Sequence, residues 1–324
     1  MKISIVGAAG CMGSSIAFCI ATRGLAEEVV ILDVTRHLLE AQAMDLGDAI
    51  VAANQDVTLV AGEYADMVGS DIVIVTASIG SLASRVSSPG EEKSGKVLSS
   101  RQELISVNIP VIQGIANAVK QYCPDCVMIT VSNPVEALSY VSYMTSDHRD
   151  RSRFIGFSLN DTIRFRAAVA QAVGVTPKDV QAVVMGEHGD SHTPIFSSIR
   201  VKGQPRSLSQ GIKENLIEKL HGHTKRFLSL KPGRTTGWLS GIGIADVVRA
   251  IRDDSEEVLP LSAILDGEYG YRGFSMSVPL VLGKQGIRRI VDIDLSDEER
   301  ADLAKSARVC EAATDFVRQT LDIV

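Results

Sequence analysis

The sequence lacks the long apolar run and the leader segment that mark membrane and secreted proteins. Nowhere in its 324 residues do about 18 consecutive apolar residues occur, so neither a membrane-spanning helix nor a membrane partner is expected. The first residues lead directly into a glycine-rich turn, which leaves no room for a signal peptide. We therefore expect a cytoplasmic protein.

Cysteine is also scarce, with five residues in the whole chain. That number does not form the dense disulfide framework of a small secreted protein, which again favours a reducing compartment. Cys123 and Cys126 have the spacing of a redox-active dithiol, but such a motif begins a helix. Here the pair lies between a predicted helix and a predicted strand, so we expect it to serve packing.

An excess of basic charge is absent as well. Thirty-three basic residues against thirty-nine acidic ones give a net charge of −6, which argues against nucleic acid as a partner. An anionic substrate would have to be captured by arginines placed locally, because the overall field does not attract it. The composition, 45% hydrophobic and 22% charged, is that of a soluble globular protein with one large α/β domain or two domains.

One short motif carries the chemistry of the chain, the segment Met185–Pro194 with the sequence M-G-E-H-G-D-S-H-T-P. His188 lies between Gly186 and Gly189, and an apolar strand, residues 180–185, delivers it. Imidazole exchanges a proton near neutral pH, but it needs a partner that fixes its tautomer and pKa. Alone, the motif is more typical of a solvated turn, and the rest of the chain overturns that interpretation.

The N-terminal residues have the pattern of a dinucleotide-binding unit. An apolar strand, residues 2–6, is followed by a turn with Gly7, Gly10 and Gly13 and then by a helix over 12–23. These glycines permit a tight turn, a close approach of the backbone to a pyrophosphate, and close packing of the helix on the strand. The free N–H groups and positive dipole end of the helix also favour phosphate.

A carboxylate completes this unit. Asp33 ends a second apolar strand, residues 29–32, and stands twenty positions after Gly13, where it can accept both hydroxyls of a ribose. Because a carboxylate repels a 2′-phosphate, NAD is favoured over NADP, although Arg36 nearby leaves NADP open. The sequence therefore predicts NAD as the cofactor.

Buried strands and helices continue to alternate beyond this unit. Continuously apolar strands are typical of a parallel sheet covered on both faces, which predicts a Rossmann doubly wound sheet with ligands outside the carboxyl ends of its strands. Asn133 is expected at such an end, before a Pro134 that we expect to fix the turn, with a cis bond as one form. The predicted elements are a helix over 38–50, strands 57–60 and 72–76, a helix over 102–122 that Pro110 kinks, and a strand over 127–131.

A long polar segment, residues 77–101, interrupts this pattern. Loops longer than about 12–15 residues in compact domains are usually lids, binding loops or disordered linkers. Its position beside the predicted nucleotide site favours a mobile active-site loop over a disordered surface loop.

The second half of the chain changes character and predicts an α/β (α+β) domain. We place a dinucleotide-binding domain at 1–147 and a catalytic domain at 148–324. Ser296 and Glu299 predict a capping box for the last helix. The elements expected after 148 are helices over 161–173, 210–230, 236–251 and 297–321 and strands within 180–185, 195–201, 262–266 and 276–282.

Four motifs in order give the chain a family resemblance. The glycine turn, V-S-N-P at 131–134, D-T-I-R-F-R at 161–166 and G-E-H-G-D-S at 186–191 resemble the lactate/malate dehydrogenase family from end to end. The resemblance implies a Rossmann domain followed by an α/β catalytic domain, with NAD as cofactor. It also implies a small 2-hydroxy or 2-oxo acid as substrate and a homodimer or homotetramer.

The resemblance further implies roles for single residues. His188 would exchange the hydroxyl proton while hydride leaves for the nicotinamide, and Asp161 would orient its imidazole and raise its pKa. Arg164, one helical turn from Asp161, would bind the substrate carboxylate through two parallel contacts. Arg101 would polarise the substrate carbonyl from the end of the mobile loop. Asn133 and Thr236 would contact substrate. The predicted cofactor-binding residues are Gly7, Gly10, Cys11, Met12, Gly13, Asp33, Thr76, Asn108 and Asn133, and no metal ligand is predicted.

The mobile loop departs from the family pattern. The usual T-A-G-x-P-R-x-x-G-M-x-R is replaced by T-A-S-I-G-S and an insertion of roughly a dozen residues. The specificity-setting arginine falls on Ser81 when counted from Thr76 and on Ser94 when counted from Arg101. We therefore favour a monocarboxylic substrate such as lactate or a bulkier 2-hydroxy acid. Malate remains the alternative, with a loop cation as the substitute, and the candidates for it are Arg85, Lys93 and Lys96.

Two other functions compete with a dehydrogenase. A catalytically silent NAD-binding protein would have no need of His188, Asp161, Arg164 and Arg101 together. The related NAD-dependent glycosidases use metal-ligating cysteine and histidine, and no such pair stands near these motifs. The combination of residues therefore favours the dehydrogenase.

Overall fold

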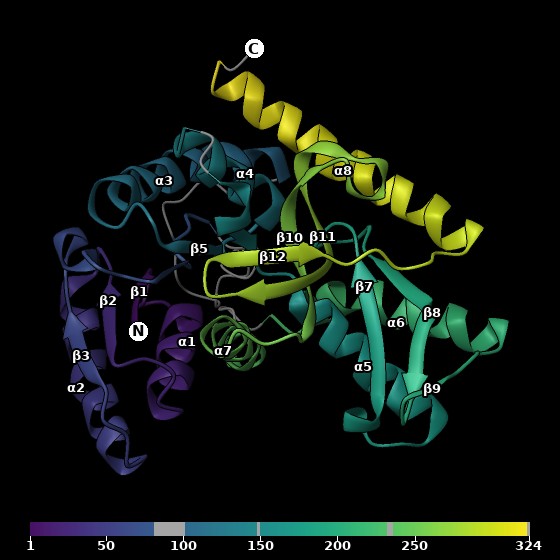
Figure 1. Ribbon diagram of the computed structural model, residues 1–324, viewed down its shortest axis with the longest axis horizontal. Helices are drawn as coiled ribbons and strands as arrows, with labels where there is room; N and C mark the ends of the chain where they lie inside the picture. The colour runs from purple at the N-terminus through teal and green to yellow at the C-terminus, as the bar shows by residue number, and fades with distance from the viewer. Residues whose placement is uncertain (81–100, 148–149, 232–235, 323–324) are drawn as a thin grey trace.

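A single large sheet forms the centre of the protein (Figure 1). The computed structural model describes residues 1–80, 101–147, 150–231 and 236–322. The strands of this sheet are β1 (Lys2–Val6), β2 (Glu28–Leu32), β3 (Thr58–Ala61), β4 (Ile72–Val75), β5 (Val127–Thr130), β6 (Phe154–Gly156), β10 (Val258–Asp266), β11 (Arg272–Gly283) and β12 (Gly286–Ile290). Among the described residues they lie in the order β12-β11-β10-β6-β5-β4-β1-β2-β3.

The strand order is that of a Rossmann sheet. Strands β3, β2, β1, β4, β5 and β6 are parallel, and this 3-2-1-4-5-6 order binds dinucleotides where it reverses, between β1 and β4. Strands β10, β11 and β12 extend the same sheet in antiparallel fashion, with Ser262 of β10 opposite Gly156 of β6. The predicted fold class is confirmed.

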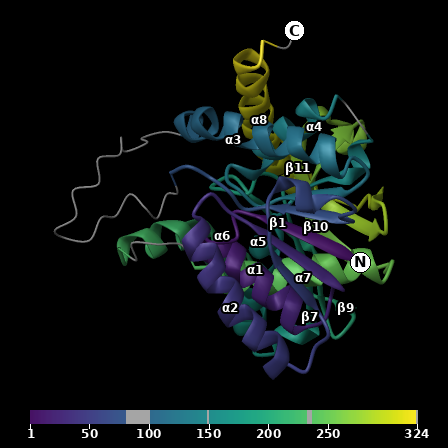
Figure 2. The same ribbon diagram turned by 90° about the vertical axis from the view of Figure 1, so that its left-hand side faces the viewer.

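Helices cover both faces of the sheet (Figures 1 and 2). On one face lie α1 (Cys11–Thr22), α2 (Arg36–Ala52) and α7 (Trp238–Arg252), and on the other lie α3 (Arg101–Tyr122), α4 (Val135–Thr145) and α8 (Asp297–Thr320). In β4, Ile72 and Ile74 point into the first core, whereas Val73 and Val75 point into the second. Each core therefore takes alternate residues of the strands, as the pleat requires.

Glycines bring the start of α7 against the start of α1. A side chain at Gly237 would place its Cβ 2.5 Å from the carbonyl oxygen of Cys11, and one at Gly241 would lie 2.9 Å from that of Ser15. Only residues without a side chain allow this approach. Because α7 packs closely on α1, Thr236, just before α7, lies at the end of the sheet where the glycine turn lies.

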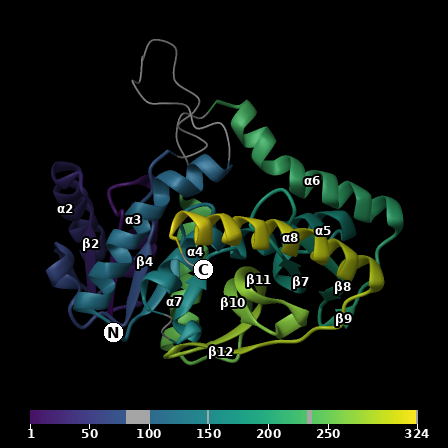
Figure 3. The same cartoon turned by 90° about the horizontal axis from the view of Figure 1, so that it is seen from above.

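A smaller three-stranded sheet holds the histidine motif. It consists of β7 (Val180–Met185), β8 (Thr193–Val201) and β9 (Gln204–Pro205), packed on α5 (Leu159–Val173) and α6 (Gln210–Ser229). Phe165, Val169, Leu216 and Leu220 form the core between them. Figure 3 shows α5 and α6 together on the side of the molecule opposite α2.

Most predicted elements occur within a few residues of their expected places. The capping box of α8 is confirmed, since Ser296 Oγ accepts from Glu299 N at 3.2 Å and Glu299 accepts from Ser296 N at 2.9 Å. Pro110 lies inside α3. Helix α4 and strands β6, β9 and β12 were not predicted. Helix α4 is buried on nearly all sides, so its sequence, V-E-A-L-S-Y-V-S-Y-M-T, shows no polar face.

Some predictions fall on parts of the chain that the structure leaves undescribed. Most of the expected mobile loop lies there, and so do Ser81, Ser94, Arg85, Lys93 and Lys96. Among the residues that are described, no helix is long and apolar enough to cross a membrane.

Candidate active site

Main-chain N–H groups of the turn that carries His188 donate to three separate elements. Gly186 has φ +94°, and a side chain there would also clash with Ser306 of α8, so glycine is required. The main-chain ties run from Gly186 N to Ser277 O of β11 (2.9 Å), from Glu187 N to Ser306 Oγ of α8 (2.8 Å) and from His188 N to Glu136 Oε1 of α4 (2.9 Å). The turn is thus fixed before any ligand binds.

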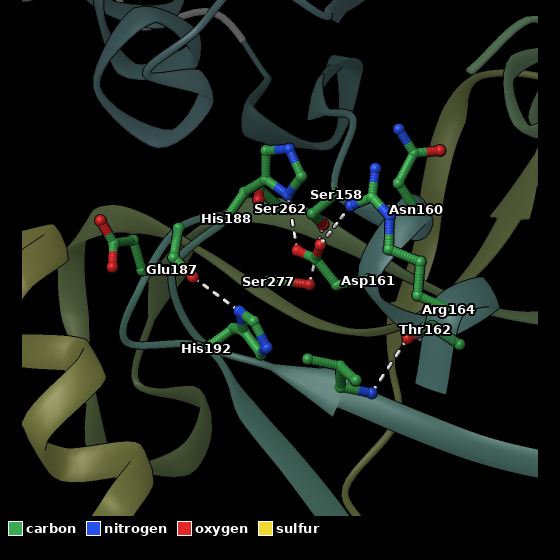
Figure 4. Close-up of polar contacts among 12 residues, drawn as sticks. Ser158, Asn160, Asp161, Thr162, Arg164, Glu187, His188, His192, Ser262 and Ser277 are labelled. Carbon is green, nitrogen blue, oxygen red and sulfur yellow. Dashed lines mark hydrogen bonds and ion pairs between the residues drawn. The ribbon is translucent and has the colours of Figure 1, made fainter. Parts of the chain in front are cut away.

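His188, Asp161 and Arg164 meet as predicted (Figure 4). His188 Nδ1 lies 2.5 Å from Asp161 Oδ2, and Arg164 donates from Nη1 to Asp161 Oδ1 at 3.1 Å. Asp161 and Arg164 are three residues apart on α5, which places them on one face of the helix. Because Nδ1 faces the carboxylate, the other ring nitrogen, Nε2, points away from it.

The pairing shifts the pKa of both partners. Burial by itself raises the pKa of Asp161 and lowers that of His188. Their mutual charge and hydrogen bond outweigh burial, so the pKa of Asp161 is lowered and that of His188 is raised. The charge of Glu136 also raises the pKa of His188, whereas Arg164 lowers it. His188 therefore keeps its proton to a higher pH than an ordinary imidazole.

Arg101, the first residue of α3, lies on the histidine turn. It forms an ion pair with Glu187, whose side chain is only 4% exposed, and donates from Nη2 to the carbonyl oxygen of His188 at 3.2 Å. A side chain at Gly189 would lie 2.6 Å from the guanidinium, so this glycine makes room for the arginine. Sequence reasoning gave Glu187 no role, although a lone acid beside the histidine was visible in the motif.

The glycine turn has the shape of a dinucleotide cradle. Gly7 has φ +92°, and a Cβ there would lie 2.5 Å from the main-chain nitrogen of Ala77. A Cβ on Gly13 would overlap the carbonyl oxygen of Gly7. A Cβ on Gly10 would meet only that same oxygen, at 3.4 Å, so the space over Gly10 is open. The turn is therefore tightly packed at Gly7 and Gly13 and open at Gly10, the glycine over which a pyrophosphate approaches.

The acid at the end of β2 fits a ribose without a 2′-phosphate. Asp33 accepts from Ala9 N at 3.0 Å and from Thr35 N at 2.9 Å, one contact to each oxygen. A carboxylate has about four acceptor positions, so two remain for hydroxyls. The guanidinium of Arg36 is held by other hydrogen bonds and is not free to bind a 2′-phosphate. Its guanidinium donates to the carbonyl oxygens of Ala61 and Gly62 and to Glu40, at 2.9, 3.0 and 2.8 Å.

Two predicted cofactor-binding residues bind other parts of the protein. Thr76 Oγ1 lies 3.0 Å from the carbonyl oxygens of both Val6 and Gly7, where it fastens the glycine turn. Asn108 is fully buried, donating to Ile79 O at 3.0 Å and accepting from Ile79 N at 2.7 Å. Their contacts with a cofactor stay predictions, and so do those of Cys11 and Met12 in the turn.

Asn133 and Thr236 lie at the same end of the sheet as the cradle. Asn133 is exposed three residues after the end of β5, and the Asn133–Pro134 peptide bond is cis, which was one of the expected forms. Thr236 is exposed before the first turn of α7. Both are accessible to a ligand, as their predicted roles require.

Two further histidines lie near the dyad and were given no role from the sequence. His192 is buried, its Nδ1 is 2.6 Å from the carbonyl oxygen of Gly189, and its ring packs edge-on against His221 of α6 at 4.6 Å. Burial lowers the pKa of His192. Burial also lowers the pKa of His223 on α6, as does the charge of Arg164. The second histidine of G-E-H-G-D-S-H was the available signal.

Comparison with known proteins shows which family has this fold and these motifs. The NAD-binding domain model of lactate/malate dehydrogenase matches residues 1–156, and the alpha/beta C-terminal domain model of the same family matches residues 159–318. The chain belongs to the lactate/malate dehydrogenase family. The resemblance found in the four motifs is confirmed, and the family's NAD-binding domain makes NAD the cofactor of this protein.

Relatives of both substrate types are similar to this family member. A malate dehydrogenase of Natronomonas pharaonis is 37% identical over 92% of this chain and 93% of its own length. An L-lactate dehydrogenase 1 of Clostridium acetobutylicum is 32% identical over 98% of each chain. The crystal structure of Cryptosporidium parvum malate dehydrogenase has a TM-score of 0.88 at 27% identity and covers 98% of this chain and 99% of that one. The protein is an NAD-dependent oxidoreductase that acts on CH–OH groups.

Proposed function

We propose that this family member is an NAD-dependent 2-hydroxy acid dehydrogenase of the lactate/malate type, with His188 as its acid and base. The observation that carries the proposal is the 2.5 Å contact between His188 and Asp161 beside Arg164. It combines a proton donor, a group that stabilises the charged donor and a cation for a carboxylate within one cluster. A 2-oxo acid presents a carbonyl and a carboxylate on adjacent carbons, which such a cluster fits.

His188 moves the proton of the reaction. In reduction its Nε2–H donates to the oxygen of the substrate carbonyl, and in oxidation the neutral Nε2 takes the proton of the hydroxyl. Asp161 stabilises the protonated imidazole and fixes its tautomer through Nδ1. When bound, NAD supplies the hydride chemistry. The residues proposed to hold it are Gly7, Gly10, Cys11, Met12, Gly13, Asp33, Thr76, Asn108 and Asn133.

Two arginines and two polar residues bind the substrate. Within the described part of the chain, Asp161 is the one hydrogen-bond partner of Arg164, so most of the guanidinium fork is left for a carboxylate. Arg101 polarises the carbonyl oxygen from its place at the start of α3, next to the main chain of His188. Asn133 and Thr236 complete the contacts, as their exposure at this end of the sheet permits.

For the substrate side chain we favour a monocarboxylic acid such as lactate or a bulkier 2-hydroxy acid. A second carboxylate buried without a cation would cost several kcal/mol. Burial and the charge of Arg164 lower the pKa of His223, which makes this histidine a neutral polar group near pH 7 rather than a cation. Malate is the second candidate, favoured by the malate dehydrogenases among the relatives and by the charge of Arg226 near His223.

A panel of substrates tests the proposal. The consumption of NADH is followed by absorbance with pyruvate, 2-oxoisocaproate, phenylpyruvate and oxaloacetate in turn. Reduction of any of them that depends on His188 supports the dehydrogenase, and no turnover of any would contradict it. A preference for oxaloacetate of more than about a hundredfold, or about 2.7 kcal/mol, would select malate. Changing Arg85, Lys93, Lys96 and Arg226 singly to Ala then identifies the cation.

We also propose a division into two domains and an assembly of identical subunits. We place the boundary between 1–147 and 148–324 and expect a homodimer or homotetramer. Sedimentation of the purified protein measures the number of subunits, and a monomer at micromolar concentration would contradict the expectation.

A further inference from the structure

A buried acid outside the predicted site holds the main chain of the acid/base residue. Glu136, on the first turn of α4, is only 2% exposed. Its Oε1 accepts from the main-chain nitrogen of His188 at 2.9 Å and from Ser262 Oγ of β10 at 3.0 Å. One carboxylate oxygen thus joins the histidine turn, α4 and the central sheet.

The surroundings of Glu136 are built to receive it. A side chain at Gly156 would place its Cβ 2.8 Å from Ser262 Cβ and 3.2 Å from Val135 Cγ2. Glycine at this position therefore allows β10 and the start of α4 to pack closely against β6. The first turn of a helix also favours negative charge. A carboxylate is expensive to bury unless its environment supplies donors. Packing alone would be served as well by an apolar residue, as it is through most of α4.

Several charged groups act on His188, and Glu136 is one of two acids that raise its pKa. The other is Asp161, which has the larger effect, and Arg164 opposes both. Within the described residues, other titratable groups at this site include Arg101 of α3 and Glu187 and His192 of the turn. His223 of α6 acts electrostatically with Asp161 and Arg164, and Cys310 of α8 acts with Glu136.

We propose that Glu136 is a positioning residue of the dehydrogenase reaction, which fixes the main chain at His188 and thereby the aim of its imidazole at the substrate. The inference rests on the proposed function. Glu136 touches neither substrate nor cofactor in this scheme and acts only through His188. Glu136 also lies three residues after Asn133, which is the proposed substrate contact before α4.

Two substitutions separate the hydrogen bond from the charge. Glu136→Gln keeps an oxygen that accepts from His188 N but removes the negative charge. The pKa of His188 should fall, so the alkaline limit of 2-oxo acid reduction moves to lower pH while KM stays nearly constant. Glu136→Ala also removes the acceptor, and kcat should fall roughly 100-fold through misplacement of the imidazole.

Glu299 supplies a matched control for loss of a buried acid. It is 7% exposed and accepts main-chain N–H groups of Ser197 and Ser296 at 2.8 and 2.9 Å, away from the histidine turn. Glu299→Gln should lower the melting temperature without moving the pH profile. If Glu136→Gln also left the pH profile unmoved and Glu136→Ala kept the kcat of the parent, the role of Glu136 would be structural only and the proposal would be overturned.

A measurement without turnover keeps this inference distinct from the proposed function. The Cε1–H proton resonance of His188, assigned by its loss in His188→Asn, is titrated by NMR in the parent protein and in Glu136→Gln. A titration midpoint at lower pH in the variant supports the inference even if no 2-oxo acid is reduced, in which case the proposed function alone fails. An unchanged midpoint together with an unchanged kcat in Glu136→Ala would overturn it. Should Glu136→Ala not fold, Glu136→Asp decides by its kcat, because it keeps the charge but draws the acceptor away from His188 N by one methylene group.

Discussion

The two halves of the candidate site are built in different ways. The nucleotide cradle comes from consecutive residues, β1, the glycine turn and β2, and its shape depends on side chains that are absent. The histidine turn is held by side chains from α4, α5 and α8 and by the main chain of β11, which lie far apart in the sequence. The cradle is defined by steric fit, and the turn by hydrogen bonds and charge.

This difference predicts two kinds of failure. A methyl group added to the cradle either fits or collides, so its effect is close to all or none. A change around the histidine turn alters a pKa or an angle, so its effect is graded and depends on pH. Substitutions on the two sides should therefore separate cofactor binding from chemistry.

The largest effect is expected at His188. In His188→Asn the proposed general acid is lost, so kcat should fall by about 10²–10⁴-fold while NADH still binds, as measured by its fluorescence. Because His188 and Asp161 act as a unit, adding Asp161→Asn should cost little more. If the loss in kcat of the double variant equalled the product of the two single losses, His188 and Asp161 would act independently and the proposed pairing would be contradicted.

Asp161→Asn alone should narrow the pH range of reduction. The raised pKa of His188 keeps the ring protonated, and ready to donate, up to a pH above that of an ordinary imidazole. A neutral amide removes the main cause of that rise, so activity in reduction is lost at a lower pH than in the parent. Oxidation needs the neutral ring, so its acidic limit moves to lower pH as well. Rate profiles in both directions check the sign, and profiles that coincide with those of the parent would contradict it.

Arg164→Lys should raise KM for the 2-oxo acid by roughly 10–100-fold, the value of one charge-assisted hydrogen bond. Lysine keeps the charge but not the planar fork that matches a carboxylate. NADH affinity serves as the internal control and should not change. A KM equal to that of the parent would move the carboxylate site elsewhere.

On the cradle side, two neighbouring glycines form a matched pair. Gly13→Ala should destabilise the protein by about 1–3 kcal/mol, because its methyl group overlaps the carbonyl oxygen of Gly7. In Gly10→Ala the methyl group meets only a 3.4 Å contact, so the melting temperature should hold while NADH affinity falls. Equal loss of stability in the two variants would show that the open space over Gly10 has no role in binding.

The smallest effect concerns the choice of cofactor. The parent should prefer NADH to NADPH in kcat/KM, and Asp33→Ser should reduce that preference by roughly tenfold, or about 1.4 kcal/mol. Arg36 is held by Ala61, Gly62 and Glu40 and should not compensate. Better use of NADPH by the parent protein would contradict the assignment of Asp33.

The sequence revealed the cradle almost completely, because every constraint on it is local. Gly7, Gly13 and Asp33 have tasks that depend on neighbours within the same strand–turn–helix–strand unit. The meeting of His188 with Asp161 required the family resemblance, since nothing in the spacing of the two motifs brings them together.

The supports of the turn escaped prediction for a physical reason. Glu136 and Ser306 are polar residues within helices, and their partners are main-chain groups more than fifty residues away. A lone acid in an apolar helix was the one visible hint, and helix α4 itself was missed because burial on all sides removes the periodicity that reveals a helix.

Two contacts fix the chain at Ile79 and at Arg101, the two ends of one stretch of sequence. They are the paired hydrogen bonds between Asn108 and Ile79 and the ion pair of Arg101 with Glu187. Loop-closure entropy grows only with the logarithm of length, about 0.6 kcal/mol for each doubling. Evolution can therefore lengthen or rewrite the residues between these two anchors at little cost to the scaffold. A change of sequence confined to that segment would let the proposed substrate preference change while the contact between His188 and Asp161 stays the same.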